Sequence, residues 1–286
     1  MSCCGSAPTS DVRRADAPGC SCTQGRGGGV MRPDAATDGA GMASLLLADS
    51  RLPVGGYTAS GGLEPALLGG LPVHEVPAFI AMRLATVARV EAGTAVVASA
   101  AVRHLRAGAP GCTCTQGGDA ATAEPVPVPE PAFASEDVAW AWAARNPVAA
   151  VRDSSIAQGR AMLRLVHRLR PDGPAAQWLE GLPRPLTARA AVLGAFAGEL
   201  GLDGASVARV VGYDDVQSVT AAALKLEPLD PVDAVAWTLD SASHLDDLVA
   251  ACADLVAPYD IPVHSAPQLE AWHAAHADTE RKLFRV

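Results

Sequence analysis

Aromatic residues are scarce in this chain. They make up 4% of its 286 residues, and Ala, Val and Leu supply most of the apolar volume. Such a composition favours closely packed helices over a β-sandwich, which is normally rich in Val, Ile, Thr, Tyr and Phe. Apolar residues still form 49% of the chain, which is enough for a sizeable core. We therefore expect a helical globular protein.

Positive charge is also in short supply. The chain has 22 Lys and Arg against 31 Asp and Glu, so its formal net charge is −9. A general nucleic-acid binder needs clustered Lys and Arg to neutralise phosphates, so we expect no nucleic-acid partner. No apolar run reaches the roughly 18 residues of a membrane span. The first residues also lack the charged-then-apolar profile of a signal peptide, so we expect a cytoplasmic protein without a membrane partner.

The common nucleotide-binding and hydrolytic motifs are missing. There is no Gly-x-x-x-x-Gly-Lys-Ser/Thr loop, no His-Glu-x-x-His and no Gly-x-Ser-x-Gly. Glycines 27–29 follow no predicted strand, so they do not form a dinucleotide fingerprint. Ser50 and Ser60 have no His/Asp pair close by in the sequence. These absences exclude the corresponding nucleotide-binding and hydrolytic sites. A small helical enzyme with a buried His in hydrogen-bond reach of a hydroxyl and a carboxylate remains possible.

Two segments contain too few large apolar residues to fold. Residues 1–41 are rich in Gly, Ala, Asp, Ser and Arg, and we expect a disordered tail there. Residues 107–135 contain glycines followed by alternating prolines, which predict an extended, flexible insertion. The folded domain is therefore expected at 42–286, interrupted by this insertion.

Elsewhere, apolar residues recur at spacings of three and four, which indicates helices. Thr187 and Asp203 are expected as N-caps, and the Asp230-Pro231 pair is expected to open a further helix. No alternating strand pattern of useful length occurs. We predict an all-α fold, a single bundle of about eight to ten helices. The predicted helices are a short one from Met42, then 76–105, 148–169, 190–200, 203–213, 215–226, 230–258 and 266–279.

The cysteines and two histidines are candidate metal ligands. Four cysteines form two Cys-x-Cys pairs, Cys20/Cys22 and Cys112/Cys114, and thiolates bind soft or borderline ions. Structural zinc motifs usually space their cysteines by two or more residues, so the alternative is a low-complexity tract. His273 and His276 lie at i and i+3 on one predicted helix and could hold a metal edge-on; otherwise they are polar residues on an exposed helix. A thiol-based nickel or zinc buffer or sensor is thus one possible function.

Residues 46–64 are the most distinctive part of the chain. Pro53, Gly55 and Gly56 force a turn, and Ser60 is placed to cap a helix whose first turn contains Glu64. The segment can be a well-capped connection between helices. A loop rich in Gly and small hydroxyls around one aromatic residue, Tyr57, can also be a recognition surface.

This segment, from Asp49 to Glu64, resembles the N-terminal signature of the urease accessory protein UreF family. Four further blocks resemble that family in the same order: 151–160, 194–201, 218–229 and the C-terminal 276–286. The chain departs from the family pattern at Ala59, Gly61, Arg189 and Lys282.

The resemblance implies an all-α, usually homodimeric protein without a cofactor or catalytic residues of its own. Such proteins join UreD (also called UreH) and the GTPase UreG on apo-urease. There they promote nickel insertion and maturation of the active site, by modulating the GTPase. The resemblance implies a GTPase-facing surface made of Gly55, Gly56, Tyr57, Ser60, Glu64 and Arg152. It also implies a UreD-facing tail that contains Lys282, Leu283 and Phe284.

Overall fold

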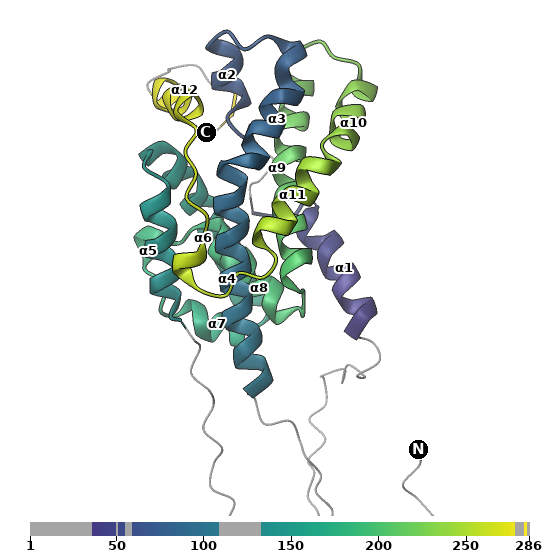
Figure 1. The fold of residues 1–286 in the computed structure, drawn as a ribbon. Helices are drawn as coiled ribbons and strands as arrows, with labels where there is room; N and C mark the ends of the chain where they lie inside the picture. Colours follow the sequence, from purple (N-terminus) through teal and green to yellow (C-terminus); the bar gives the residue numbers. More distant parts are fainter. Residues whose placement is uncertain (1–35, 50, 55–58, 109–132, 278–282, 285–286) are drawn as a thin grey trace, which may run out of the picture.

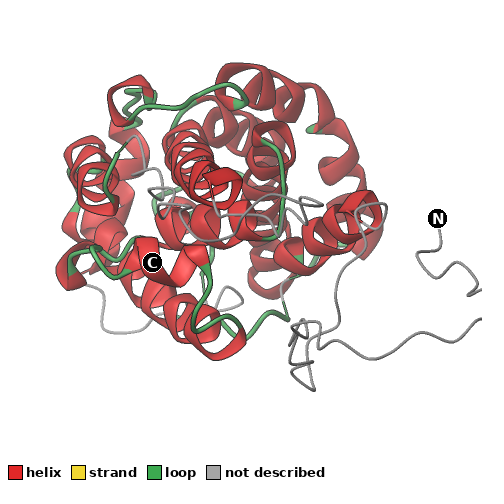
Figure 2. Cartoon of the chain, turned by 90° about the horizontal axis from the view of Figure 1, so that it is seen from below, coloured by secondary structure: helices red, strands yellow, loops and turns green. Residues whose placement is uncertain are grey.

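The computed structural model describes residues 36–49, 51–54, 59–108, 133–277 and 283–284, and these residues form an all-α bundle without a β-strand (Figures 1 and 2). The α-helices are α1 Ala36–Ala48, α2 Leu63–Leu68, α3 Val76–Ala85, α4 Val87–Gly108, α5 Ser135–Arg145, α6 Ala149–Leu169, α7 Pro174–Leu179, α8 Arg189–Glu199, α9 Gly204–Leu226, α10 Pro231–Asp240, α11 Ala242–Cys252 and α12 Pro267–Ala277. Three short 3-10 turns are η3 Val73–Glu75, η4 Arg184–Leu186 and η5 Pro258–Asp260. The predicted fold class is confirmed.

The centre of the bundle is the crossing of α4 with α8 and α9. Figure 1 shows α4 running through the middle of the molecule, with α5, α6 and α7 on one side and α9, α10, α11 and α1 on the other. Two glycines of α8 make the crossing close. A Cβ on Gly194 would lie 2.0 Å from the carbonyl oxygen of Ala95, and one on Gly198 would lie 2.6 Å from that of Ser99. The scarcity of aromatic residues thus corresponds to helices that touch through small residues.

The predicted helix 76–105 is wrong in one respect, because it is broken at Thr86. That residue leaves the helical region with φ −125° and ψ −94°, and α4 begins directly after it. The Thr86 hydroxyl donates to the Met82 carbonyl oxygen at 2.7 Å. A Thr hydroxyl that donates to the carbonyl oxygen four residues earlier competes with the backbone hydrogen bonds of the helix and bends it. The spacing of apolar residues in the sequence does not reveal such a break.

Two further helix boundaries differ from the prediction. The segments 203–213 and 215–226 form the single helix α9, while the segment 230–258 contains α10 and α11, separated at Ser241. The Ser241 hydroxyl donates to the Thr238 carbonyl oxygen at 2.7 Å, and its backbone has ψ −3°. The helix α6 agrees with the predicted 148–169 almost to the residue.

The predicted caps were partly correct. Asp203 accepts from the Ser206 amide at 2.7 Å, and Asp230 accepts from the Val232 amide at 2.9 Å. Thr187 does not cap α8: its hydroxyl donates to the Arg184 carbonyl oxygen, and the N-cap position is Ala188.

Two helices were not predicted. Proline and glycine on both sides obscure the short helix α7, and α5 buries mainly small residues around Trp142. The helix α1 begins at Ala36, inside the segment 1–41 for which the sequence predicts disorder. Residues 1–35 and 109–132, which hold most of that tail and of the predicted insertion, lie outside the described residues.

One helical segment is longer and more apolar than expected from the sequence, in which no apolar run reaches the length of a membrane span. Residues 73–107, which include α3 and all but the last residue of α4, are long and apolar enough to cross a membrane by length and composition alone. In the bundle, 67% of its most apolar window is buried. A core helix of a globular protein passes the same test, and the packing of α4 at the centre explains the composition.

Candidate functional site

A partly open cavity of about 160 Å³ lies between helices of the bundle, beside the residues that lead into α2. Its walls come from α3, α4, α5, α6, α8, α9 and α12, so helices from distant parts of the sequence contribute to it. Fourteen of the lining residues are polar or charged: Arg83, Glu91, Arg145, Asn146, Ser154, Ser155, Gln158, Arg189, Asp214, Asp215, Ser218, His264, Glu270 and His273.

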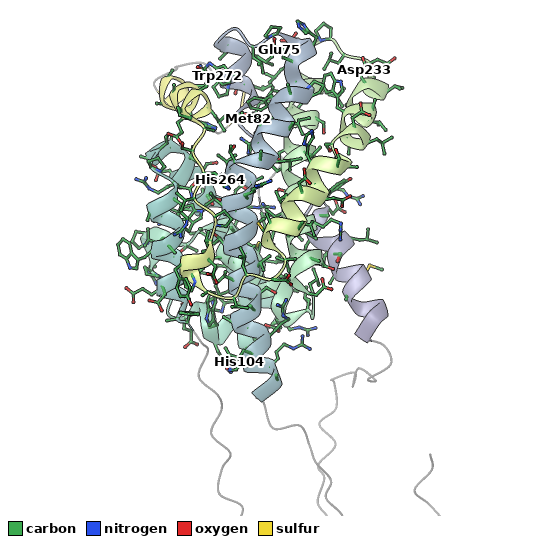
Figure 3. All side chains as sticks on the ribbon, in the orientation of Figure 1. Glu75, Met82, His104, Asp233, His264 and Trp272 are labelled. Carbon is green, nitrogen blue, oxygen red and sulfur yellow. The ribbon has the colours of Figure 1, made fainter. Side chains whose placement is uncertain are left out.

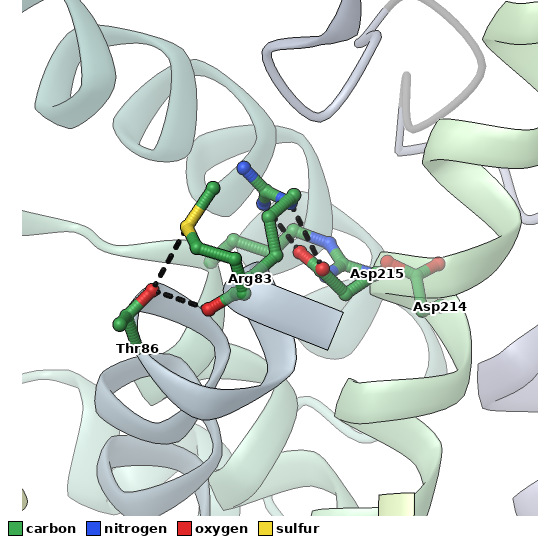
Figure 4. A network of polar contacts seen from close by, with 6 residues as sticks. Arg83, Thr86, Asp214 and Asp215 are labelled. Atoms are coloured by element: carbon green, nitrogen blue, oxygen red, sulfur yellow. Dashed lines mark hydrogen bonds and ion pairs between the residues drawn. The ribbon is translucent and has the colours of Figure 1, made fainter. Parts of the chain in front are cut away.

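The first ion pair of this cavity joins α3 to α9. Arg83 Nε donates to Asp215 Oδ2 at 3.0 Å, and Arg83 Nη2 donates to Asp215 Oδ1 (Figure 4). The two side chains are 10% and 15% exposed. The guanidinium also lies 5.9 Å from the centre of the Phe79 ring. This fork-to-fork geometry is the strongest form of an Arg–carboxylate contact, and it fixes the register between the two helices.

The second ion pair uses the neighbouring aspartate. Arg189 Nη2 lies 3.0 Å from Asp214 Oδ2, and the side chains are 15% and 19% exposed. Burial raises the pKa of Asp214 above its ordinary value, and the Arg189 charge opposes that rise. Two successive aspartates in the middle of α9 are therefore each matched by an arginine from another helix. This pairing explains why α9 continues through a sequence that suggests a helix start.

A third carboxylate, Glu91 of α4, adds negative charge to the same cavity. Its Oε1 accepts from Trp142 Nε1 at 2.7 Å. Burial raises the pKa of Glu91 above its ordinary value of 4.5, and the Trp142 bond, the first opposing cause, lowers it. Four carboxylates, those of Glu91, Asp214, Asp215 and Glu270, thus line the cavity with three arginines, Arg83, Arg145 and Arg189. Because negative charge is in excess here, the stability of the fold depends on the protonation state of Glu91.

We expect Glu91→Gln to make the protein more stable than the wild type as the pH rises. A raised folded-state pKa means that the folded protein holds this proton more tightly than the unfolded chain. The favourable contribution of Glu91 is therefore complete below its unfolded pKa and is lost as the pH rises through the folded pKa. Gln cannot ionise, yet its Oε1 can still accept from Trp142. Urea unfolding of both proteins from pH 5 to pH 8 measures the difference.

A matched control is Glu136→Gln, because Trp140 Nε1 donates to exposed Glu136 at 3.2 Å in the same kind of pair. There the substitution should change unfolding little. A stability difference between wild type and Glu91→Gln that stays constant across this pH range would contradict the expectation.

Among the sequence-predicted site residues, His273 lines this cavity, the described partner-binding residues do not, and the others lie outside the described residues. Gly55, Gly56 and Tyr57 belong to the latter group. The Ser60 hydroxyl accepts from the Glu64 amide at 3.4 Å, but the predicted cap is wrong, because the N-cap position of α2 is Gly62. Arg152 Nη1 donates to the carbonyl oxygens of Asn146, at 2.6 Å, and Pro147, at 2.7 Å. Its guanidinium therefore holds the turn that leads into α6.

Glu64 is not on an open surface. It is 6% exposed, and its carboxylate accepts from the backbone amides of Leu283, at 2.6 Å, and Phe284, at 2.9 Å. The Phe284 side chain is 4% exposed, whereas Leu283 is 65% exposed. Lys282 lies outside the described residues. The structure therefore brings together one residue of the predicted GTPase-facing set and two of the predicted tail set.

The predicted metal ligands are not assembled in the part of the chain that the structure describes. Cys20, Cys22, Cys112 and Cys114 lie outside it, as does the side chain of His276. His273 is 6% exposed, which corrects the alternative that it is a polar residue on an exposed helix. A Cβ on Gly62 would lie 2.7 Å from His273 Nε2, so this histidine packs directly under the loop. Among the described residues no group of three or more His, Cys, Asp or Glu could hold a metal ion.

Sequence reasoning missed the charged residues of the cavity. Arg83 and Glu91 stand in otherwise apolar helical stripes, and Asp214 and Asp215 stand inside an apolar helix. A charge at a buried helical position is itself a signal, because such a group needs a partner. His264 also lines the cavity.

In the described residues, the fold and the site define a helical bundle with two ion pairs at a cavity and with a helix, α2, that contacts Leu283 and Phe284. A UreF family profile matches residues 73–242. Urease accessory protein UreF from Mycobacterium sp. (strain JLS) is 32% identical over 244 residues, which cover 84% of this chain and 96% of that protein. UreF proteins of the same coverage from Mycolicibacterium vanbaalenii and Mycobacterium marinum are 32% and 31% identical. The chain belongs to the UreF family of urease accessory proteins.

Proposed function

We propose that this chain is a non-enzymatic scaffold in the maturation of urease. In this proposal it joins UreD/UreH and the GTPase UreG on apo-urease, promotes nickel insertion and modulates the GTPase. The observation that carries the proposal is the similarity to UreF proteins over 96% of their length. Members of this family work together with other urease maturation factors. The particular partners and the effect on the GTPase are our inference.

The arrangement of charges supports a scaffold role. The arginines and aspartates of the cavity are engaged with one another across helices, as in a network that fixes a unique packing. Apolar side chains, by contrast, stand out on the surface. Val232, Val235 and Leu239 of α10 are 69%, 60% and 70% exposed and follow one helical face. A continuous exposed apolar face is typical of protein–protein contact. We further propose that the chain forms a homodimer in the cytoplasm and has no cofactor of its own.

The direct test is reconstitution. The chain is co-purified with UreD, UreG and apo-urease, and urease is then activated with nickel in the presence and absence of the chain. We expect a complex that contains all components and an activation that depends on this chain. Equal activation without it would overturn the proposal.

We place Tyr57 and residues 55–62 on the GTPase-facing surface. A tyrosine at the centre of an interface is typically worth about 2 kcal/mol or more, so Tyr57→Ala should weaken capture of the GTPase roughly 30-fold. The matched control is Tyr259→Ala, since Tyr259 is 77% exposed on η5. Quantitative pull-down measures both. Undiminished capture by Tyr57→Ala would remove this loop from the interface. Arg152→Ala is less specific, because it also frees the turn held by that residue.

A further inference from the structure

The outward face of α6 has a concentration of positive charge in a chain whose formal net charge is −9. Arg160, Arg164 and Arg168 are exposed and follow one another at spacings of four residues, so they lie on one side of the helix. We call these three residues the arginine stripe. The stripe is about 12 Å long, because a helix rises about 1.5 Å per residue.

In the part of the chain that the structure describes, carboxylates do not neutralise the arginine stripe. Residues 154–171 contain no Asp or Glu, and none of the three arginines forms an ion pair with a described residue. Like charges four residues apart repel one another and weaken a helix. Negative charge is exposed elsewhere, for example at Asp233 of α10, on the other side of α4 (Figure 3). The stripe therefore does not stabilise α6, and its charge can attract a partner.

The packing of α6 fixes the direction in which the stripe points. Met162 and Val166, on the opposite side of the helix, are completely buried. At Gly159 the helix touches the segment that leads into α8, since a Cβ there would lie 2.0 Å from the Thr187 carbonyl oxygen. A rotation of α6 would expose this buried side and separate the two backbones. The stripe is therefore presented on a rigid support, and a partner has to order only flexible side chains.

The side-chain chemistry of the stripe fits carboxylates. A guanidinium presents parallel N–H groups that match the two oxygens of a carboxylate, and it is more weakly hydrated than an ammonium group. Arg160 Nη2 also donates to the Arg184 carbonyl oxygen at 3.2 Å, so η4 and the exposed Arg184 lie beside one end of the stripe. Several guanidinium groups in succession favour a run of carboxylates over a single one.

The length of the stripe favours a short acidic segment over a larger polyanion. About four residues of extended chain cover about 12 Å, at roughly 3.3 Å per residue. A DNA duplex or an anionic membrane extends far beyond the stripe and would approach the rest of a chain with net charge −9. At physiological salt that repulsion acts over about 8 Å. A short acidic segment, by contrast, contacts only the stripe.

We propose that the arginine stripe of α6 binds a carboxylate-rich segment of a partner protein through guanidinium–carboxylate pairs. This surface is distinct from the loop and the tail that the proposed function uses. The stripe therefore adds a third attachment surface to the scaffold, and its test does not depend on the identity of the other partners.

The experiment uses the full-length chain and a fluorescein-labelled peptide of eight glutamates, with the corresponding all-glutamine peptide as the probe control. Fluorescence anisotropy measures the affinity at low salt. Arg164→Gln combined with Arg168→Gln should weaken binding of the glutamate peptide about tenfold, because two exposed ion pairs are lost. The matched control is Arg51→Gln combined with Arg209→Gln, which removes the same charge from exposed side chains outside α6. This control should bind the peptide like the wild type.

A lysine variant tests the guanidinium itself and keeps the positive charge on the helix. Arg164→Lys combined with Arg168→Lys should weaken binding at least about threefold, because an ammonium group cannot form the paired contact with a carboxylate. Circular dichroism reports whether each variant keeps its helices. Binding by the lysine variant as tight as that of the wild type would overturn the guanidinium–carboxylate pairing.

Two larger anions decide between classes of partner. The wild-type chain is titrated with a DNA duplex and with vesicles that contain phosphatidylserine, at the same concentration of anionic charge as the glutamate peptide. We expect the peptide to bind most tightly. Tighter binding to the duplex or to the vesicles would overturn the proposal, as would equal peptide affinity of the α6 glutamine variant and its Arg51/Arg209 control.

Discussion

Asp215→Asn should lower the free energy of unfolding by about 3–5 kcal/mol. Removal of one partner of a buried ion pair leaves the other charge buried and unpaired, and losses of this size are typical. Arg83 would remain in a site where it is only 10% exposed, beside Phe79 and under Gly61. The loss should be seen in urea unfolding followed by circular dichroism. Because the pair joins α3 to α9, we also expect faster hydrogen exchange in both helices.

A double-mutant cycle separates the pair from its surroundings. Arg83→Met with Asp215→Asn should cost much less than the sum of the single changes, because the double variant leaves no unpaired charge. The matched surface control is Asp246→Asn. Its partner Arg209 lies 3.7 Å away between α9 and α11, and the side chains are 73% and 52% exposed. Such a pair contributes about 0–1 kcal/mol. Asp215→Asn with a loss no larger than that of Asp246→Asn would contradict the interpretation.

Gly194→Ala should destabilise the protein by about 3 kcal/mol, at the upper end of the usual cost of overpacking a core. The added methyl group would lie 2.0 Å from the Ala95 carbonyl oxygen and 2.6 Å from its Cα. Both are backbone atoms of α4, so a whole helix must move to relieve the overlap. A loss of this size corresponds to a fall of roughly 6–12 °C in the unfolding midpoint of a domain of this size.

Gly41→Ala is the control for this glycine. It lies in α1, and nothing is within 4 Å of the position of an added Cβ. Ala is the better helix former, so this variant should be unchanged or more stable by up to about 1 kcal/mol. Thermal unfolding of the two variants side by side tests the close approach of α8 to α4. Equal midpoints for Gly194→Ala and the wild type would show that the helices can separate without cost.

Local signals in the sequence were sufficient for much of the helical architecture. The helix α6 follows from its apolar stripe, and the caps of α9 and α10 follow from Asp203 and Asp230, because a cap needs only groups a few residues apart. The breaks at Thr86 and Ser241 were missed although their hydrogen bonds are local. At each break, a side-chain hydroxyl donates to a nearby carbonyl oxygen and competes with the helical backbone hydrogen bonds. The spacing of apolar residues does not reveal this competition.

The candidate site divides in the same way. Its loop could be recognised from the segment that ends at Glu64, since Gly, Pro and small hydroxyl residues mark such a turn locally. The cavity could not, because its Arg83–Asp215 ion pair joins residues 132 positions apart. Which arginine meets which aspartate depends on how α3, α8 and α9 are rotated and shifted relative to one another. A single sequence does not give this register, so it does not show which arginine pairs with which aspartate.

By itself, then, the sequence determined the helical class, most helix positions and the family, since these depend on the period of apolar residues and on contiguous motifs. Only the tertiary structure decided that two successive aspartates of α9 are neutralised from two different helices, and that Glu64 holds the tail. The physical reason is distance along the chain. A buried charge requires a partner, but packing alone determines which part of a 286-residue chain supplies it.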